Sequence, residues 1–504
     1  MNIILTTLNA RYTHTSIALR YLFANLHEFK ENASIQEYTI NDNIHEIAEK
    51  IIKSNPSILG IGVYIWNSLI VSELINIIKK ILPNTIIILG GPEVSYEPYR
   101  VDFSAADYII KGEGEESLYY LIKDIFNGKK RDKSIIESKY VELDSIVLPY
   151  EYYNDHDISN RIIYVEASRG CPFRCEFCLS SIDKKVRDFP IETLLGQFEL
   201  LWEKGARNFK FIDRTFNLNI NKSIKILNYF LGKNDDYLIH FEVIPEHFPQ
   251  EIRDKIKKFK PGTIQLEVGI QTLNPEIAER INRPMNFNKI KDNLEFLENE
   301  TKAHLHVDLI IGLPGESIMS FSKNLNTLGL ITNCEIQLGV LKKLSGTTLC
   351  RHDIDFEMIY SDIPPYEILS NSEISYLEMQ ELKRFTRYWD LCYNSGNFKD
   401  TIKYLWMDGD IYNGFNNFSL WLYKVSSSTH NISLNRLTEY LYEYLTSVIN
   451  ISKNEVSDIL IRDLTRVDGR KIPLFLKENA TFVPQIKFSE KKTLGKRQER
   501  HKDS

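Results

Sequence analysis

The sequence predicts an α/β protein with a doubly wound parallel sheet at its N-terminus, a central partial (βα)6 barrel and a C-terminal α-rich domain. Short β-branched runs alternate with helical stretches over the first 130 residues, and a second series of the same kind fills residues 161–350. Beyond residue 350 the pattern turns mainly helical. Strands alternating with helices of about ten to fifteen residues indicate βαβ units on parallel sheets. A chain of 504 residues also exceeds one ordinary domain core, so two or three domains are expected.

The first series occupies residues 1–130 and contains five expected strands, which suits a doubly wound sheet of the flavodoxin type. In such sheets ligands bind outside the carboxyl ends of the strands. Any one glycine-bearing loop here could be a simple tight turn, but four polar or glycine-rich loops on one rim favour a ligand. The candidate contacts are Arg11, Tyr12, Thr13 and His14 after the first strand; Tyr64, Trp66 and Asn67 after the third; Gly90, Gly91, Pro92 and Glu93 after the fourth; and Gly112, Glu113 and Gly114 after the fifth.

The remaining boundaries follow from changes in pattern. Residues 131–160 lose the periodicity and carry mixed charge, which indicates a linker. Six expected strands then lie within residues 161–350, at 162–168, 209–217, 237–245, 263–274, 304–314 and 335–344. Six repeats are too few for a closed barrel of eight, so a partial barrel is expected. Residues 351–488 form the expected helical domain, dense in Tyr and Trp, and residues 489–504 form a charged tail.

The composition excludes several classes of protein. A formal net charge of −6 and a pI near 6.1 provide no global positive field, so nucleic acid is not an expected partner. The first residues show no secretory signal, and no stretch approaches the roughly 20 apolar residues of a membrane span. We therefore expect a soluble cytoplasmic protein without a membrane partner. Six cysteines in 504 residues are too sparse for a disulfide framework.

Three of those cysteines, Cys171, Cys175 and Cys178, lie together in the stretch SRGCPFRCEFC. A structural zinc site usually needs four ligands, and the other cysteines lie singly and far away, so zinc is the weaker interpretation. A 4Fe-4S cluster held by three thiolates leaves its fourth iron open for a ligand that is not protein. The loop follows the first strand of the second series, at the rim where barrel active sites lie.

The CxxxCxxC spacing, with Phe177 just before the last cysteine, resembles the signature of the radical S-adenosylmethionine (SAM) superfamily. The resemblance implies that the open iron binds SAM and that electron transfer cleaves it to a 5'-deoxyadenosyl radical. It also implies SAM contacts at the strand ends, although the usual Gly-Gly-Glu triplet is absent. Those expected contacts are Phe177, Asp213, Arg214, Glu242, Glu267 and Gln271, with Gly312, Pro314 and Glu316 in the motif DLIIGLPGES.

A flavodoxin-like domain ahead of such a barrel resembles the cobalamin-binding class of the superfamily. The stretches GIGVYIWN, LGGPEVSY and DYIIKGEGEESL carry this resemblance, which makes cobalamin the second expected cofactor and the four loops its expected contacts. The Asp-x-His-x-x-Gly loop that supplies an axial histidine is missing; His14 stands in the corresponding loop without its Asp and Gly. The dimethylbenzimidazole tail is then expected along the crevice near Gly90 and Gly91.

The C-terminal stretch KRFTRYWDLCYNSGNF resembles the accessory domain of an uncharacterised subfamily of these proteins. The class implies an enzyme that methylates an unactivated carbon of an unknown small-molecule substrate, with an electron donor such as flavodoxin or ferredoxin. Three alternatives stay open: radical rearrangement or cyclisation without methyl transfer, transfer-RNA methylthiolation, and a cobalamin- or redox-sensing module that is not an enzyme. Methylthiolation is disfavoured because no cysteine precedes residue 171.

Overall fold

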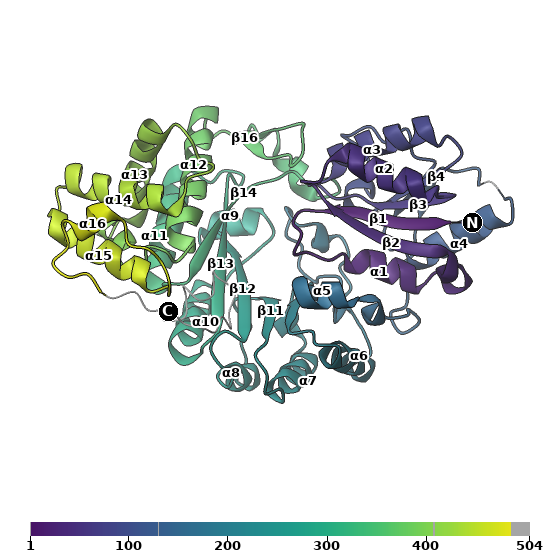
Figure 1. Cartoon of the computed structure of the whole chain (residues 1–504), viewed down its shortest axis with the longest axis horizontal. Helices are drawn as coiled ribbons and strands as arrows, with labels where there is room; N and C mark the ends of the chain where they lie inside the picture. The colour runs from purple at the N-terminus through teal and green to yellow at the C-terminus, as the bar shows by residue number, and fades with distance from the viewer. Residues whose placement is uncertain (1, 130, 407–408, 485–504) are drawn as a thin grey trace.

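The computed structural model describes residues 2–129, 131–406 and 409–484, and these fold into three parts that follow one another along the chain (Figure 1). The N-terminal sheet lies at one end of the molecule, the second sheet lies in the middle and the C-terminal helices lie at the other end. The predicted fold class is confirmed. The predicted charged tail, residues 489–504, lies outside the described residues.

The first sheet is parallel and has the order β2-β1-β3-β4-β5-β6. Two hydrophobic clusters flank it, one formed with α2 and α3 and the other with α1 and α4. Because helices cover both faces, the seven residues of β1 are all buried. The elements are β1 (Ile3–Asn9), α1 (Ile17–Ala24), β2 (Ala33–Thr39), α2 (Ile44–Ser54), β3 (Ile58–Gly62), α3 (Ser68–Ile81), β4 (Ile86–Gly90), β5 (Tyr108–Lys111), α4 (Glu115–Phe126) and β6 (Ile135–Glu137).

The strand β6 corrects the expectation of five strands. Its residues fall in the segment 131–160, which the loss of periodicity marked as a linker, but they pair in parallel with β5. The same segment also contains α5 (Asp155–Asn160) and the fully buried Tyr150. A three-residue strand is too short to show a period, so the sequence pattern could not reveal it.

The second sheet is also parallel, in the order β14-β13-β12-β11-β10-β7, which is the expected series of six barrel strands. A short antiparallel pair, β8 and β9, follows the first of them. The elements are β7 (Ile163–Val165), β8 (Ser168–Arg169), β9 (Arg187–Asp188), α6 (Ile191–Glu203), β10 (Asn208–Phe211), α7 (Ile220–Leu231), β11 (Leu238–Val243), α8 (Gln250–Ile256), β12 (Ile264–Gln271), α9 (Pro275–Arg280), α10 (Phe287–Glu300), β13 (His304–Ile311), α11 (Ile318–Ile331) and β14 (Glu335–Val340).

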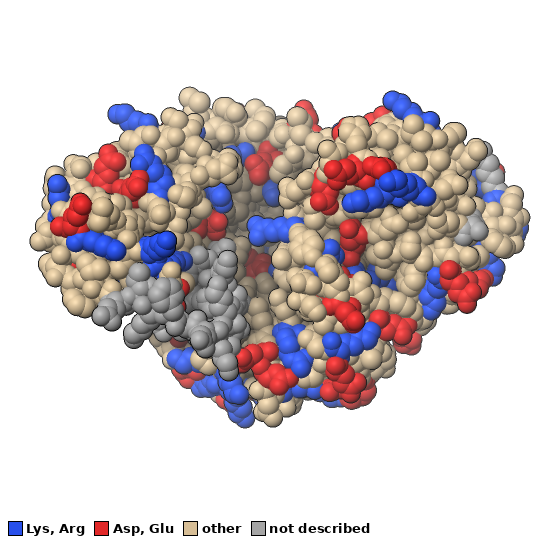
Figure 2. Space-filling model, viewed as in Figure 1, with Lys and Arg blue, Asp and Glu red and all other residues tan. Residues whose placement is uncertain are grey.

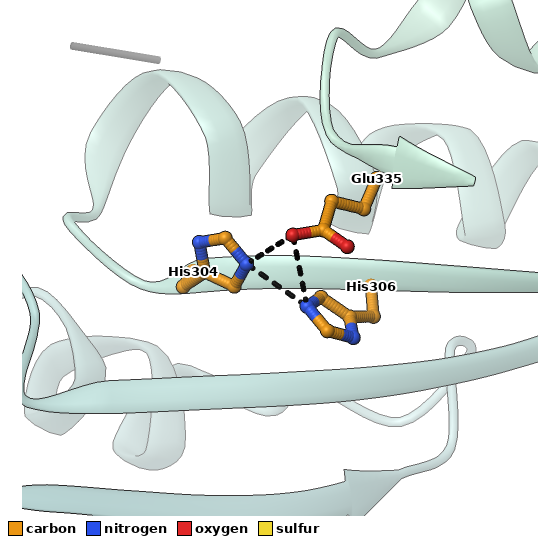
Figure 3. Close-up of side chains that lie close together, drawn as sticks. All are labelled: His304, His306 and Glu335. Carbon is orange, nitrogen blue, oxygen red and sulfur yellow. Dashed lines mark hydrogen bonds and ion pairs between the residues drawn. The ribbon is translucent and has the colours of Figure 1, made fainter. Parts of the chain in front are cut away.

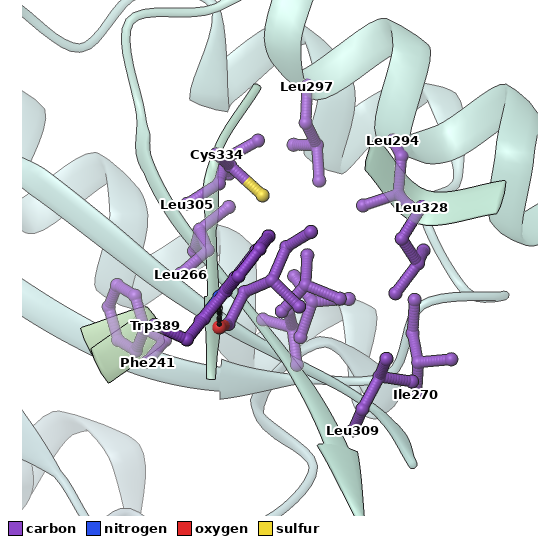
Figure 4. Close-up of a cluster of buried hydrophobic side chains, with 14 of the residues drawn as sticks. Phe241, Leu266, Ile270, Leu294, Leu297, Leu305, Leu309, Leu328, Cys334 and Trp389 are labelled. Atoms are coloured by element: carbon purple, nitrogen blue, oxygen red, sulfur yellow. Dashed lines mark hydrogen bonds between the residues drawn. The ribbon is translucent and has the colours of Figure 1, made fainter. Parts of the chain in front are cut away.

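The two faces of this sheet differ in chemistry. Side chains alternate strictly along β12, where Leu266 and Ile270 are buried and the intervening Gln265 and Glu267 are partly exposed. The apolar set packs toward the covering helices in one hydrophobic cluster with Leu309 of β13 (Figure 4). The polar set occupies the inner face of the partial barrel, which is the side on which we look for a site.

The C-terminal region begins with a small antiparallel pair, β15 and β16, and then becomes helical. It docks on the barrel edge strand β14, where Trp389 Nε1 donates to the Ile336 carbonyl at 2.9 Å. Asn394 also bonds to the backbone N–H and C=O of Ile336, each at 2.9 Å, and so covers part of this sheet edge. The elements are β15 (Ile359–Tyr360), β16 (Ile368–Ser370), α12 (Tyr376–Trp389), α13 (Ile411–Ser426), α14 (Leu434–Ser447), α15 (Lys453–Thr465) and α16 (Leu474–Lys477).

Two surface properties bear on partners. In the view of Figure 2, acidic and basic side chains are interspersed, and the surface is hollowed between the C-terminal helices and the N-terminal sheet. Among the described residues, no helix combines the length and the apolar character needed to cross a membrane.

Candidate active site and cofactor cavity

The cysteine loop is anchored at both ends. At its start, Asp213 accepts hydrogen bonds from Ala167 N at 2.8 Å and from Ser168 Oγ at 2.5 Å. Cys171 N then donates to the Asp183 carbonyl at 2.9 Å. Gly170 has a φ of 87°, and a Cβ there would lie 2.4 Å from the Lys185 carbonyl oxygen, so only glycine fits this turn.

The three thiols share a site with positive charge beside it. Cys171 and Cys175 are buried and Cys178 is partly exposed. Burial raises the pKa of Cys171 and Cys175, and the nearby Arg283 opposes this rise. Arg283 Nη1 lies 3.8 Å from Cys175 Sγ, where its charge favours the thiolate that an iron requires.

The three cysteines are not arranged as the compact ligand group of a single metal ion. Among the described residues, the group of His, Cys, Asp and Glu side chains whose ligand atoms all lie within 4.8 Å of one another is His304, His306 and Glu335. The three cysteines do not belong to such a compact group. A 4Fe-4S cluster, in which each thiolate binds a different iron, does not require one.

Glu176, between the second and third cysteines, clamps the loop to the rest of the protein. Its side chain is 1% exposed, and its two oxygens contact Arg351 Nη2 at 2.6 Å, His352 Nε2 at 2.7 Å and Asn282 Nδ2 at 3.0 Å. Its own N–H donates to the Ile281 carbonyl at 3.1 Å. The segments around residues 281 and 351 thus hold the loop from outside the barrel strands.

An arginine–glutamate pair lies next to the loop on the inner face of the barrel. Arg214 donates to both carboxylate oxygens of Glu242, at 2.7 and 2.8 Å. Burial raises the pKa of Glu242, while the negative charges of Glu242 and Cys178 raise that of Arg214. The structure thus brings Arg214 and Glu242, two of the expected SAM contacts, together beside the third cysteine.

Further along the inner face, Glu267 lies 3.1 Å from His240 Nε2 and 3.6 Å from Lys210 Nζ. Burial alone would raise its pKa, but these neighbours hold the pKa of Glu267 at about 2. Asp308 on β13 behaves in the opposite way. Burial, and then the charges of Glu267 and Glu242, raise the pKa of Asp308 well above its usual value. The inner face therefore offers a carboxyl group with a low pKa and one with a raised pKa on neighbouring strands.

Two expected SAM contacts have other partners in the structure. Both Asp213 oxygens are committed to the start of the cysteine loop, so Asp213 positions the loop instead of presenting a free carboxylate. Glu316 is 1% exposed, and its Oε1 accepts from Thr272 Oγ1 at 2.7 Å and Asn324 Nδ2 at 2.8 Å. Burial raises the pKa of Glu316 to about 7. Its carboxyl group therefore belongs to the packing between β12 and α11.

The remaining expected SAM contacts lie at the ends of β12 and β13 or in the cysteine loop. Phe177 packs partly buried against the barrel core. Gln271 has a φ of 73° and closes β12. Gly312 faces Ile368 of the C-terminal region, where a Cβ would lie 2.8 Å from its Cγ2 atom, and the Pro314 carbonyl accepts from Arg280 Nη1 at 2.8 Å. The glycine motif thus packs against neighbouring protein on at least one side.

A cavity of about 250 Å³ lies where the N-terminal sheet meets the barrel. Apolar side chains and glycines from the carboxyl ends of β3, β4 and β5 line one wall, and Glu166, Arg169 and Ile212 of the barrel line another. A Cβ on Gly90 would meet nothing closer than 3.7 Å, so the protein itself leaves room there for a side chain. The expected cobalamin contacts in the lining are Tyr64, Gly90, Gly91, Gly112, Glu113 and Gly114.

The expected contacts after the first strand lie elsewhere. Arg11, Tyr12, Thr13 and His14 form a loop that docks on the first barrel strand, where the Thr13 carbonyl accepts from Ile162 N at 2.8 Å. Burial, then Arg11 and Lys210, lower the pKa of His14. The structure therefore places this loop at the interface between the two sheets and outside the lining of the cavity.

Four further candidates also lie outside the lining. Asn67 is fully buried, and its amide bonds to Thr7, Leu8, Gly62 and Tyr64, so it ties the ends of β1 and β3 together. Trp66 stacks on Tyr64 with ring centroids 4.5 Å apart. Pro92 opens a short 3-10 turn, and Glu93 accepts a hydrogen bond from Tyr366 of the C-terminal region.

A network of ion pairs joins the cavity to the cysteine loop. Arg169 contacts Glu115 at 2.7 Å, Glu166 at 3.1 Å and Glu113 at 3.5 Å. Arg187 also contacts Glu113 at 2.5 Å. Burial alone would raise the pKa of Glu113, but the two arginines and a backbone hydrogen bond from Val141 lower it. Arg169 is thus bonded to the N-terminal domain and lies two residues before Cys171.

Sequence reasoning missed Arg169, Glu176 and Arg283, which hold the loop and its charge. Arg169 is part of the SRGC stretch and Glu176 lies between two cysteines, so proximity to the motif was the available signal. Arg283 lies 108 residues after Cys175 and carries no local signal. Only the fold brings it to Cys175.

Comparison with protein families agrees with this site. A model of the B12 binding domain matches residues 3–122, and a model of the radical SAM superfamily matches residues 165–328. A third model, a protein of unknown function (DUF4080), matches residues 354–502. The chain therefore contains a B12-binding domain followed by a radical SAM domain.

Similar curated proteins include an uncharacterized methyltransferase of Pyrococcus horikoshii, 25% identical over 333 residues, which cover 60% of this chain and 71% of that protein. The cobalamin-dependent radical SAM methyltransferase TokK of Streptomyces tokunonensis is 22% identical over 340 residues, which cover 59% of this chain and 49% of TokK. The chain thus spans about half the length of TokK.

Among solved structures, the cobalamin-dependent SAM radical enzyme OxsB with aqua-cobalamin bound aligns with a TM-score of 0.61 at 15% identity, covering 92% of this chain and 78% of OxsB. The methyltransferase TsrM from Kitasatospora setae, with cobalamin and a [4Fe-4S] cluster bound, aligns with a TM-score of 0.56 at 16% identity, covering 69% and 74%. These identities establish a shared fold. Together with the matched domains they identify an enzyme whose cofactors are a 4Fe-4S cluster, SAM and cobalamin.

Proposed function

We propose that this enzyme transfers a methyl group to an unactivated carbon of a small-molecule substrate. The observation that carries the proposal is the cavity shared by the B12-binding domain and the barrel, with Arg169 linking its wall to the cysteine loop. Two relatives, from Pyrococcus horikoshii and Streptomyces tokunonensis, are named methyltransferases, which supports the same reaction.

When bound, the cluster and SAM supply a radical that abstracts hydrogen, and cobalamin supplies the methyl group. The side chains of this chain bind and orient. Arg283 favours the thiolate form of Cys175, and the Arg214–Glu242 pair presents fixed charge beside Cys178. The raised pKa of Asp308 favours its protonated form, which can donate a hydrogen bond into the barrel, whereas the low pKa of Glu267 favours a carboxylate that can only accept.

A cavity-filling variant tests where cobalamin binds. Gly90→Leu places a side chain in the cavity at a position whose Cβ the protein tolerates. After anaerobic reconstitution with iron, sulfide and hydroxocobalamin, we expect about four irons per chain and a corrinoid affinity lowered by about tenfold or more. Gly196→Leu is the matched control, because a Cβ on Gly196 meets no atom within 4 Å.

The triple variant Cys171→Ala, Cys175→Ala and Cys178→Ala tests the cluster in the same assay. It should lose the iron and keep corrinoid binding. If reconstituted wild-type protein binds no cluster, the three cysteines are better interpreted as zinc ligands, and the proposal is refuted. Unchanged corrinoid binding by Gly90→Leu would show that cobalamin does not bind in this cavity.

The second candidate function is radical cyclisation or rearrangement without methyl transfer. It is favoured by similarity to the anaerobic magnesium-protoporphyrin IX monomethyl ester cyclase of Cereibacter sphaeroides, 22% identical over 303 residues. The two products of SAM distinguish the reactions. Methyl transfer yields S-adenosylhomocysteine together with 5'-deoxyadenosine, whereas cyclisation yields 5'-deoxyadenosine alone. An anaerobic assay with metabolite fractions and deuteromethyl-labelled SAM measures this ratio and marks any methylated product.

We also propose a cytoplasmic location and an electron donor such as flavodoxin or ferredoxin. The donor is needed because each reductive cleavage of SAM consumes one electron. Replacing dithionite by purified flavodoxin and its reductase in the same assay tests this requirement.

A further inference from the structure

A second cluster of possible metal ligands lies at the other end of the barrel strands. His304 and His306 project from the same face of β13, and Glu335 begins the neighbouring strand β14, in register with His306 (Figure 3). These three residues, here called the His-His-Glu triad, lie at the amino ends of their strands, whereas the cysteine loop follows the carboxyl end of β7.

The atoms of the triad converge on one point. His304 Nε2 lies 2.9 Å from His306 Nε2 and 3.0 Å from Glu335 Oε1, and His306 Nε2 lies 3.5 Å from Glu335 Oε1. Two ligands that are each about 2.05 Å from a tetrahedral zinc ion lie about 3.3 Å apart, close to these three distances. The side chains are between 0% and 12% exposed, so the arrangement is built into the protein interior.

We propose that the His-His-Glu triad binds a divalent transition-metal ion, with zinc as the first candidate. Two imidazole nitrogens and one carboxylate oxygen form a ligand set that zinc uses with a fourth, water position. The absence of sulfur ligands separates this site from the cysteine loop, whose thiolates suit iron. The proposal concerns an additional ion and is independent of the methyl-transfer reaction.

A neighbouring amide can hold one histidine in the required tautomer. The amide nitrogen of Gln337, two residues after Glu335, lies 2.7 Å from His306 Nδ1. A half-turn of this amide exchanges its nitrogen and oxygen, and with the oxygen in that place Gln337 accepts the Nδ1 proton and leaves the lone pair of Nε2 for the metal. This outer contact is typical of metal-binding histidines.

The ion would cross-link β13 to the edge strand β14. The C-terminal helices dock on the same strand through Trp389 and Asn394, both of which bond to Ile336, the residue after Glu335. Conserving this register matters because a shift of one residue would turn every side chain of β14 to the opposite face. The metal site therefore has a structural role beneath the active-site rim.

Zinc binding can be measured without interference from the cluster in the full-length Cys171→Ala, Cys175→Ala and Cys178→Ala variant. We expect about one zinc per chain after loading and gel filtration, by elemental analysis, and an X-ray absorption spectrum with nitrogen and oxygen ligands only. Adding His306→Ala or Glu335→Gln should abolish this zinc. Zinc should also raise the melting temperature of the parent variant and leave that of the Glu335→Gln protein unchanged.

His240→Ala is the matched control, because His240 also lies on the inner face and its ring centroid is 6.3 Å from that of His306. It should retain zinc. The proposal is overturned if the parent variant binds no zinc. The three side chains would then be held together by hydrogen bonds alone. It is also overturned if the absorption spectrum shows sulfur ligands, or if zinc loss is equal in His240→Ala and His306→Ala. The spectrum of the parent variant decides the question even where a substituted protein fails to fold.

Discussion

Replacing Glu316 by glutamine should make the protein less sensitive to alkaline pH. Burial raises the pKa of Glu316 to about 7 from 4.5, and three neutral side chains, Thr272, Ser320 and Asn324, are its hydrogen-bond partners. Because the folded-state pKa is raised, this carboxyl stabilises the fold fully below pH 4.5, and the contribution is lost as the pH rises through 7. At 1.36 kcal/mol per unit, the loss amounts to about 3 kcal/mol between pH 4.5 and pH 8.

The quantity to measure is the difference in unfolding free energy between Glu316→Gln and wild type, by anaerobic denaturant titration at several pH values. Glutamine has the same shape as glutamate but does not titrate, so its contribution to the unfolding free energy does not change with pH. The difference should therefore shift in favour of the variant by about 3 kcal/mol from pH 4.5 to pH 8. Glu276→Gln, in the first turn of α9, is the control and should show no such trend. A difference that stays constant with pH would refute the reasoning. Weakened SAM binding would instead restore the interpretation of Glu316 as a cofactor contact.

Three other substitutions test the supports of the site. Arg169→Leu leaves Glu115 and Glu166 without their shared guanidinium at a buried interface, so unfolding free energy should fall by about 3–5 kcal/mol; a loss below 1 kcal/mol in denaturant titration would contradict this. Glu176→Gln weakens charge-assisted bonds to the loop worth about 1.5–3 kcal/mol, so iron should be released to a chelator faster than from wild type; equal release rates would argue against the clamp. Trp389→Ala removes a side chain that is 1% exposed and bonded to Ile336, and should cost about 3–5 kcal/mol in unfolding free energy; an unchanged denaturation midpoint would exclude this anchor.

The sequence predicted the parts of the fold that have a period. All six barrel strands were found, because each is apolar on alternate residues and is separated from the next by a helical stretch. The strand β6 was missed, since three residues show no alternation. The short pair β15 and β16 was missed within the helical region for the same reason.

The candidate site was predicted only as far as residue type and position along a strand allow. Glycines at the ends of β4 and β5 do line the cavity, because the end of a parallel strand fixes where its next residues lie. Asp213 and Asn67 occupy equivalent positions but turn inward to bond to backbone groups. The partners of a side chain at a strand end lie in other segments, so sequence position cannot distinguish a residue that contacts a ligand from one that holds a loop.

The interface between the first two domains connects the cavity with the cysteine loop. The antiparallel pair β8 and β9 carries Arg169 and Arg187, and both bond to Glu113 at the wall of the cavity. The first cysteine follows Arg169 by two residues, so the position of the cysteine loop depends on how the N-terminal domain packs against this pair. A wedge between the two domains should therefore disturb iron and corrinoid binding together, whereas a side chain placed only in the cavity should affect the corrinoid alone. The network is thus the physical reason to expect that both cofactor sites depend on this one interface.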